Sequence, residues 1–271
     1  YFGALAYFLT NHWEYPWFIL ALTLITFISF VDDIRSISQS LRLMLHFTAM
    51  VLMFYQWGLF TLPWWWIIVA LIVCTGIINA YNFMDGINGI TGGYSLVILG
   101  ALAYINTEIT QFVEPALIYT VLCYVLVFCF FNFRKKAKCF AGDVGSVSIA
   151  FILLFLIGKL ILKTEDFSWI ILLSVYGVDS VLTIVHRLML HENIGLPHRK
   201  HMYQLMANEL KIPHVAVSLV YMLTQALVIL GYFCFVGYGY WYLLGIIVLL
   251  SSIYVLFMRK YFHFYVQQGK K

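Results

Sequence analysis

Long apolar runs recur along the whole of this 271-residue chain, and they constrain its fold more than any other feature. Hydrophobic residues make up 63% of the sequence and charged residues only 10%, whereas a soluble domain has about 25% charged residues. Runs of roughly 15–20 apolar residues are typical of helices that cross a bilayer. Backbone groups in lipid must be satisfied internally, and the alternating pattern of a membrane barrel is absent from the sequence, so we predict helices.

We predict an all-α fold, a polytopic membrane bundle with about ten transmembrane helices. The predicted spans are residues 1–10, 16–31, 43–57, 63–79, 93–106, 115–131, 144–162, 168–185, 213–234 and 239–258. They form a single integral-membrane domain over residues 1–271. The chain opens at Tyr1, inside an apolar run and without an initiator Met, so we expect its N-terminus to be truncated.

The basic residues gather on one side of the membrane if every predicted span crosses once. Of the 16 Lys and Arg residues, only Lys159 and Lys163 fall elsewhere. The positive-inside rule makes that side cytoplasmic. The predicted cytoplasmic segments are the loops 32–42, 80–92, 132–143 and 186–212 and the tail 259–271.

Four polar motifs fall on this same predicted side. They are VDDIRS (31–36), NAYNFMDGING (79–89), FAGDVGS (140–146) and HRLMLHENIGLPHRKHMYQ (186–204). Ionisable groups at the ends of membrane helices are candidate functional residues. The motifs bring four carboxylates together with histidines and cations, and carboxylate and amide oxygens suit Mg²⁺ shared with substrate phosphates.

Each motif alone also has a purely structural interpretation. Asp32 and Asp33 could end a solvated helix, and Asp143 could be a helix N-cap. Asn79 and Asn82 could join neighbouring membrane helices by hydrogen bonds. Because all four motifs fall on one predicted face, we favour a reaction site for two anionic substrates and a divalent cation.

The motifs, in this order, resemble those of the polyprenyl-phosphate N-acetylhexosamine-1-phosphate transferases, a group similar to glycosyltransferase family 4. The resemblance spans residues 31–204 by motif. It implies a phosphoglycosyl transferase of the bacterial inner (cytoplasmic) membrane that requires Mg²⁺, with Mn²⁺ as an alternative. The implied partners are a UDP-N-acetylhexosamine, undecaprenyl (polyprenyl) phosphate and membrane lipid. The implied products are polyprenyl-diphospho-sugar and UMP. We expect no nucleic-acid partner and leave a homodimer open.

The resemblance also implies roles for individual residues. Asp143 matches a metal-binding aspartate, Asp32 and Asp33 match paired aspartates near the lipid phosphate, and Phe140 matches an aromatic that packs on uracil. Asp179 matches a further family aspartate. The implied metal ligands are Asp143 and Asp85, and the implied catalytic residues are Asp32, Asp33, Asp85 and His201. The implied substrate-binding residues are Asn79, Asn82, Asn88, Phe140, Arg187, His198 and Arg199.

Two departures from the family pattern indicate which branch of the family the chain resembles. Asn88 stands where the family commonly has a second aspartate, so an acidic role is lost there while hydrogen bonding to uracil is retained. The last loop reads HRKHMYQ, and only His201 matches the repeated histidines of the family. This points away from the peptidoglycan translocase and towards a branch that initiates polysaccharide or glycan assembly.

Other readings stay open from the sequence. A secondary transporter would place ionisable residues near the bilayer midplane and show broken helices in two halves. A CDP-alcohol phosphotransferase also has an Asp-Gly near a membrane surface, but needs further spaced aspartates that DGINGITGGYS does not contain. Direct attack by the lipid phosphate and a covalent aspartyl-phosphate route are both open. The transferred sugar is open among GlcNAc, GalNAc and 6-deoxy N-acetyl sugars.

Overall fold

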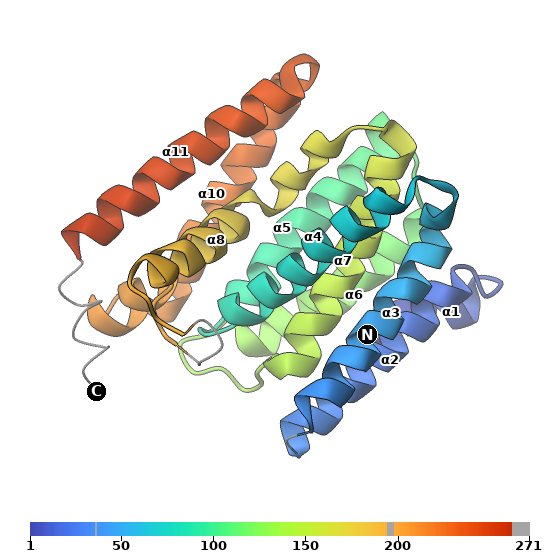
Figure 1. Ribbon diagram of the computed structural model, residues 1–271, viewed down its shortest axis with the longest axis horizontal. Helices are drawn as coiled ribbons and strands as arrows, with labels where there is room; N and C mark the ends of the chain where they lie inside the picture. The colour runs from blue at the N-terminus through green and yellow to red at the C-terminus, as the bar shows by residue number, and fades with distance from the viewer. Residues whose placement is uncertain (36, 194–197, 262–271) are drawn as a thin grey trace.

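A computed structural model of the chain describes residues 1–35, 37–193 and 198–261 (Figure 1). These described residues form α-helices joined by short 3₁₀ and π-helical segments, and they contain no strand. The helices are α1 (Phe2–Thr10), α2 (Pro16–Ile34), α3 (Gln39–Trp57), α4 (Trp64–Met84), α5 (Ile90–Tyr104), α6 (Pro115–Asn132), α7 (Gly142–Thr164), α8 (Ser174–Met189), α9 (Met202–Gln204), α10 (His214–Cys234) and α11 (Gly239–Lys260).

The prediction of a polytopic membrane bundle is confirmed, while the predicted number of ten spans is not. Within the described residues, 8 helical segments are long and apolar enough to cross a membrane. Two of them include irregular turns, because α5 continues into a π-helical segment at Ile105–Ile109 and α8 follows the 3₁₀ segment Phe167–Leu173. Two predicted spans are missing from the eight. Helix α1 has 9 residues, which is too short to cross, and α3 carries the polar residues Arg42, His46 and Gln56.

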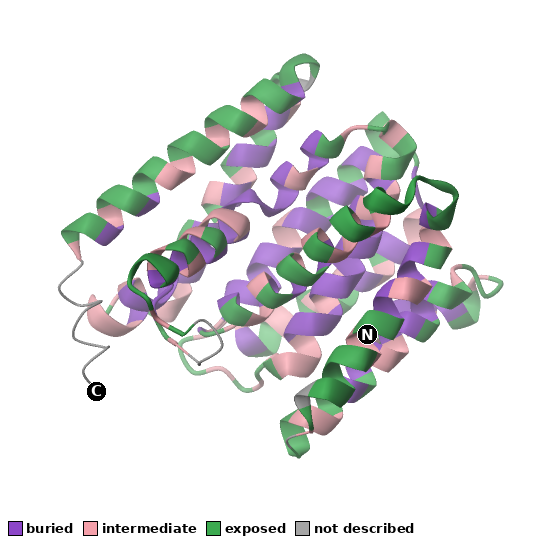
Figure 2. Ribbon diagram, viewed as in Figure 1, coloured by how far each residue is buried: buried purple, intermediate pink, exposed green. Residues whose placement is uncertain are grey.

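Helices α5 and α7 occupy the middle of the bundle, where most of their residues are buried (Figure 2). Helix α7 packs against α2 and α4, and α5 packs against α6 and α10. Helix α11 packs against α8 and exposes most of its apolar surface, as expected for a helix that faces lipid. The outer helices α2, α4, α6 and α10 therefore pack around the two inner helices α5 and α7.

The polar motifs meet because of the direction in which the helices run. Helices α2 and α4 end, and α3 and α7 begin, on the lower side of the view in Figure 1.

At the other end of the bundle, α4 starts after Pro63 with the exposed residues Trp64–Trp66, an aromatic cluster typical of a membrane interface. Proline at the first position also starts α2 and α6, where its missing N–H costs no hydrogen bond.

Candidate active site

A cleft of about 820 Å³ opens where α2 and α4 end and α3 and α7 begin. Its walls come from five parts of the chain that are far apart in the sequence. The polar side chains that line it are Ser29, Asp32, Arg42, His46, Thr75, Asn79, Asn82, Asp85, Asp143, His198, His201, Tyr203 and Gln204. Seven of the predicted site residues are among them: Asp32, Asn79, Asn82, Asp85, Asp143, His198 and His201.

The centre of the cleft is a contact between α4 and α7. The Asn82 side-chain amide donates a hydrogen bond to Asp143 Oδ1 at 2.9 Å and lies 3.5 Å from Ser146 Oγ. Asn79 lies one helical turn before Asn82 and lines the same cleft, as a spacing of three residues dictates. The amide thus orients the carboxylate of Asp143 and leaves its second oxygen available for a ligand.

Asp85 follows directly on the last residue of α4 and lines the cleft beside Asp143. The pKa of the Asp85 carboxyl is raised to about 6, first by burial and then by the nearby negative charge of Asp143. Two acidic groups that repel each other therefore lie side by side in the cleft. A bound cation would relieve this repulsion.

The two adjacent aspartates of α2 have different surroundings. Asp32 lines the cleft, where Oδ1 accepts from the Ile37 backbone N–H at 3.1 Å and Oδ2 from Arg42 Nη1 at 3.0 Å. Asp33 does not line it. Its exposed carboxylate instead accepts a 3.3 Å hydrogen bond from the Val144 backbone N–H, in the first turn of α7.

Helix α7 has no cap of its own, because its N-cap residue is Ala141. Asp33 supplies the missing acceptor from another helix, and a negative charge at a helix N-terminus is favourable. Gly142 makes the approach possible: its φ is +59°, and a Cβ there would lie 3.0 Å from Asp33 Oδ2. Asp33 therefore helps to place Asp143, the residue that follows Gly142.

This cap gives a stability prediction. Asp33→Ala removes the acceptor for the α7 N-terminus and is expected to lower the free energy of unfolding by about 1 kcal/mol. Asp33→Asn keeps a side-chain oxygen and should cost only a few tenths of that amount. Thermal unfolding of the three proteins in detergent measures the difference. Equal melting temperatures for Asp33→Ala and the parent would contradict a capping role.

The histidines enter the cleft from the segment before α9. His198 is half-buried and its pKa is lowered to about 4, by burial first and then by the positive charges of His201, Arg187 and Lys200. A neutral imidazole is therefore present at this position near neutral pH. His201 is 1% exposed, and its ring lies between those of Phe83 and Tyr203.

Four predicted substrate-binding residues lie outside the lining of the cleft. Asn88 turns its amide to the backbone carbonyls of Arg134 and Lys135, at 3.0 and 3.3 Å. Phe140 is 75% exposed, and Arg199 is exposed as well. Arg187 is buried and donates to Glu192 Oε2 and to the Asn193 carbonyl. Their roles towards substrate stay predictions.

Sequence reasoning missed Arg42, His46, Tyr203 and Gln204 as lining residues. Arg42 had a usable signal, because it follows Asp32 across a short connection between two helices that pack together. Tyr203 donates to the Phe83 carbonyl at 2.8 Å, and Gly86 leaves room for its hydroxyl, since a Cβ at Gly86 would lie only 2.2 Å away. No pattern in the sequence predicts the contact of Tyr203 with Phe83 and Gly86.

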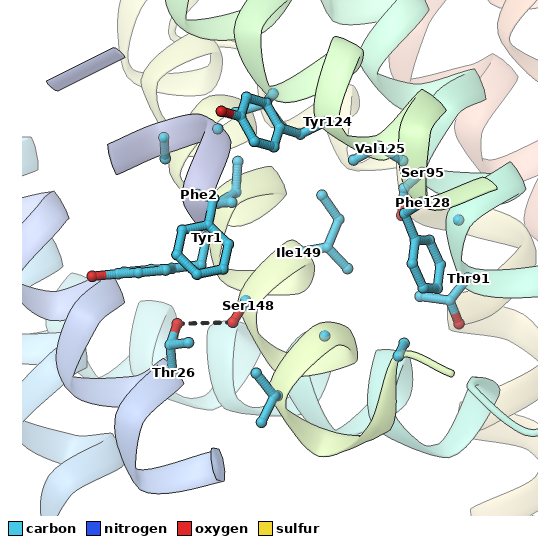
Figure 3. A pocket seen from close by; sticks show the side chains of 18 of the residues that line it. Tyr1, Phe2, Thr26, Thr91, Ser95, Tyr124, Val125, Phe128, Ser148 and Ile149 are labelled. Atoms are coloured by element: carbon cyan, nitrogen blue, oxygen red, sulfur yellow. Dashed lines mark hydrogen bonds between the residues drawn. The ribbon is translucent and has the colours of Figure 1, made fainter. Parts of the chain in front are cut away.

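A second cavity of about 560 Å³ lies on the opposite face of α7 and is almost entirely apolar (Figure 3). Aromatic rings such as Phe2, Tyr124 and Phe128 surround it. Its main polar contact is a 2.8 Å hydrogen bond between Thr26 Oγ1 and Ser148 Oγ. Unlike the cleft, it has no charged side chain among the described residues that line its wall.

The chain is similar in sequence to several transferases. The chain is 30% identical over 149 residues to a probable undecaprenyl-phosphate N-acetylglucosaminyl 1-phosphate transferase of Bacillus subtilis, covering 53% of this chain and 41% of that protein. It is 27% identical over 165 residues to an undecaprenyl-phosphate α-N-acetylglucosaminyl 1-phosphate transferase of Yersinia pestis, with 54% and 45% covered. A phospho-N-acetylmuramoyl-pentapeptide-transferase of Lactiplantibacillus plantarum is 33% identical over 92 residues, with 34% and 28% covered.

The matched region spans less than half the length of each of these relatives. Both N-acetylglucosaminyl 1-phosphate transferases and a phospho-N-acetylmuramoyl-pentapeptide-transferase are among them, so the branch of the family stays a prediction. The sequence pattern of glycosyl transferase family 4 matches residues 15–160, which include α2, α3, α4 and the start of α7. Since this match covers more than half of the chain, the protein is a multi-pass membrane member of glycosyl transferase family 4.

Proposed function

We propose that the protein transfers an N-acetylhexosamine-1-phosphate from a UDP-sugar to undecaprenyl or another polyprenyl phosphate. An oxygen of the lipid phosphate forms a bond to the β-phosphorus of the UDP-sugar. The bond between that phosphorus and the bridging oxygen breaks, and UMP leaves with the bridging oxygen. The product is a polyprenyl-diphospho-sugar, the first membrane-bound intermediate of a surface polysaccharide or glycan.

The observation that carries this proposal is the content of the cleft at the ends of membrane helices. Asp85, Asp143 and Asn82 lie together there, and Arg42 and three histidines line the same cleft. Two anionic substrates repel each other, so their reaction needs a cation and fixed donors where charge develops. A lipid phosphate at this level keeps its isoprenoid tail in the bilayer while a soluble nucleotide enters from the polar side.

The donor set fits Mg²⁺. No group of three His, Cys, Asp or Glu side chains within the described part of the chain is close enough to form a complete metal site. Mg²⁺ is commonly held by one or two carboxylates and completed by waters and substrate phosphates. Asp143 and Asp85 would hold it, with Asn82 orienting Asp143. When bound, the ion neutralises diphosphate charge.

The paired aspartates divide their work in this proposal. Asp32 faces the cleft with its charge partnered by Arg42, so it is the residue placed to orient the lipid phosphate or to take its remaining proton. A phosphate monoester with its second pKa near 6 is already largely dianionic at neutral pH. Attack therefore needs little help from a base, which favours the direct route over a covalent aspartyl-phosphate.

Measurement of UMP release tests the proposed function. The 271-residue protein, purified and placed in liposomes with undecaprenyl phosphate and Mg²⁺, is supplied with UDP-GlcNAc, UDP-GalNAc or a UDP-linked 6-deoxy N-acetyl sugar. We expect UMP and lipid-linked sugar in equal amounts with at least one of these, and neither product without lipid phosphate. A burst of UMP before lipid is added, equal in amount to the enzyme, would instead support the covalent route. Uptake of a nucleotide sugar without UMP would point to a transporter.

We also propose that the cleft faces the cytoplasm, because the basic residues lie on its side of the bundle. Single cysteines introduced at Lys135 and Arg199 in a chain without its own cysteines are expected to react with impermeant reagents only from the cytoplasmic side. A cysteine at Glu165, just after α7, is the matched control for the other side. Labelling of Lys135 and Arg199 positions from opposite sides would contradict the proposed site.

A further inference from the structure

A buried carboxylate and a buried imidazole lie next to each other behind the wall of the cleft. Asp179 on α8 is 2% exposed and His201, in the segment before α9, is 1% exposed. His201 Nδ1 lies 3.5 Å from Asp179 Oδ1. Unpaired buried charges are costly, so a carboxylate at this depth requires partners. His201 lines the cleft, whereas Asp179 does not, so only the histidine can touch a substrate there.

The Asp179 carboxylate is held from three directions. Oδ2 accepts a 2.6 Å hydrogen bond from the Tyr221 hydroxyl on α10. Oδ1 accepts from the Met202 backbone N–H at 3.1 Å and from Thr183 Oγ1 at 3.2 Å. Thr183 is itself 2.9 Å from the Tyr254 hydroxyl on α11. With contributions from α8, α9, α10 and α11, the carboxylate has little freedom to turn.

The imidazole of His201 is fixed in a similar way. Its backbone N–H donates to Gln204 Oε1 at 3.2 Å, which places the residue at the start of α9. The rings of Phe83, His198 and Tyr203 surround it, with centroids 6.1, 4.9 and 5.9 Å away. Nδ1 and Nε2 are both buried, and neither makes a hydrogen bond among the described residues. Nδ1 lies 3.5 Å from Asp179 Oδ1, whereas Nε2 has no ion-pair contact with a carboxylate of these residues. A buried polar atom without a partner costs free energy, which a ligand that fills the cleft would recover.

We propose that Asp179 is a positioning residue that holds His201 with Nδ1–H towards its carboxylate and Nε2 towards the cleft. There Nε2 contacts a phosphate oxygen of the substrates, a ligand assignment that rests on the proposed function. The pairing fixes which ring nitrogen carries the proton on the Asp179 side, because a carboxylate can only accept. The same logic orients metal-bound and catalytic histidines that donate to a carboxylate behind them.

Asp179→Asn tests this arrangement kinetically. The Asn amide can turn its N–H groups to the ring, so Nδ1 becomes an acceptor and the proton moves to Nε2. We expect the kcat for UMP release to fall by about 100-fold or more, with the KM for the UDP-sugar within about threefold of the parent. His201→Ala should lose a similar amount, and the double variant little more than either, because the two residues act as a unit.

Tyr221→Phe is the matched control. It removes one hydrogen bond from the same buried carboxylate but leaves the charge and the contact with His201. We expect a loss of less than about tenfold in kcat, as for one hydrogen bond among several. If Tyr221→Phe falls as far as Asp179→Asn, or if the losses of Asp179→Asn and His201→Ala multiply in the double variant, the positioning role is wrong.

A spectroscopic measurement gives a readout that does not depend on turnover. In protein with ¹⁵N-labelled histidine, the His201 signal, assigned by its loss in His201→Gln, should show the Nδ1–H tautomer in the parent. It should shift towards Nε2–H in Asp179→Asn. An unchanged tautomer would overturn the proposal even if activity falls. Absence of UMP from the parent with every UDP-sugar would overturn the proposed function while leaving the tautomer result to stand.

Discussion

Replacing Asp143 by Asn is expected to abolish turnover while the protein stays folded. The change removes one negative charge and one ligand oxygen from the centre of the cleft, and it exchanges an acceptor for a possible donor opposite the Asn82 amide. We expect a loss of at least about 1000-fold in kcat, which corresponds to about 4 kcal/mol in the barrier. UMP release at saturating substrates and Mg²⁺ measures it.

Asp166→Asn is the matched control for this variant. Asp166 follows α7 at its other end, where its side chain accepts from the Ser168 backbone N–H at 2.8 Å, a bond that Asn can also make. This control should keep its activity. Should Asp143→Asn remain within about tenfold of the parent, the metal would have to be held by other residues, with Asp85 the first to test.

Removal of divalent cations is expected to have an effect of similar size. A chelator should lower UMP release by about 100-fold or more, and added Mg²⁺ should restore it, with Mn²⁺ as the alternative ion to compare. Asp85 predicts how this requirement varies with pH. Because its pKa is raised to about 6, a cation must displace a proton below that pH. The apparent affinity for Mg²⁺ should then fall by about tenfold per pH unit below about pH 6.

In the metal-free protein, the Asp85 carboxyl changes stability with pH in the opposite direction to most aspartates. Its folded pKa of about 6 lies above the unfolded value of about 3.9, so the folded state binds the proton more tightly. The contribution of Asp85 to the free energy of unfolding is therefore largest below about pH 4, and it is lost as the pH rises to about 6. His198 contributes with the opposite sign over this range, because its folded pKa is lowered to about 4. Comparing parent and Asp85→Asn isolates the first effect, and identical profiles would show that Asp85 is not buried as described.

The helices and their order could be predicted from the sequence, because apolar runs of this length have few alternatives. Apolar runs in the sequence did not separate α1 and α3 from the eight helical segments that are long and apolar enough to cross a membrane, because α1 is short and α3 carries scattered polar residues. The meeting of the four motifs was predicted from a count of ten crossings, and residues of all four do line one cleft although that number of spans is not confirmed. Seven residues predicted for the site do line one cleft.

Orientation of individual side chains was beyond the sequence. Asp32 and Asp33 were both predicted to lie near the lipid phosphate, but neighbouring residues on a helix point about 100° apart, and the two have different surroundings. Which of them faces the cleft depends on the rotation of α2 against α7, and only the structure supplies that rotation. Asn88 could pair with a nucleotide or with carbonyl groups equally well, and here its amide lies against the loop after α6. The hydrogen bonds that hold Asp179 come from residues on other helices, so the sequence did not reveal them.

The loop between α6 and α7 is tied down at several points. Asn88 binds its carbonyls at residues 134 and 135, and Asn132 both accepts from the Gly89 N–H at 2.7 Å and donates to the Cys139 carbonyl at 2.8 Å. Its four basic residues, Arg134, Lys135, Lys136 and Lys138, are therefore carried on a backbone of fixed position. A fixed cluster of charge acts on a diffusing anion before any contact is made, and it raises the encounter rate. Through the position of these charges, Asn88 and Asn132 would thus influence how fast an anionic ligand arrives, an effect that dissolved salt weakens.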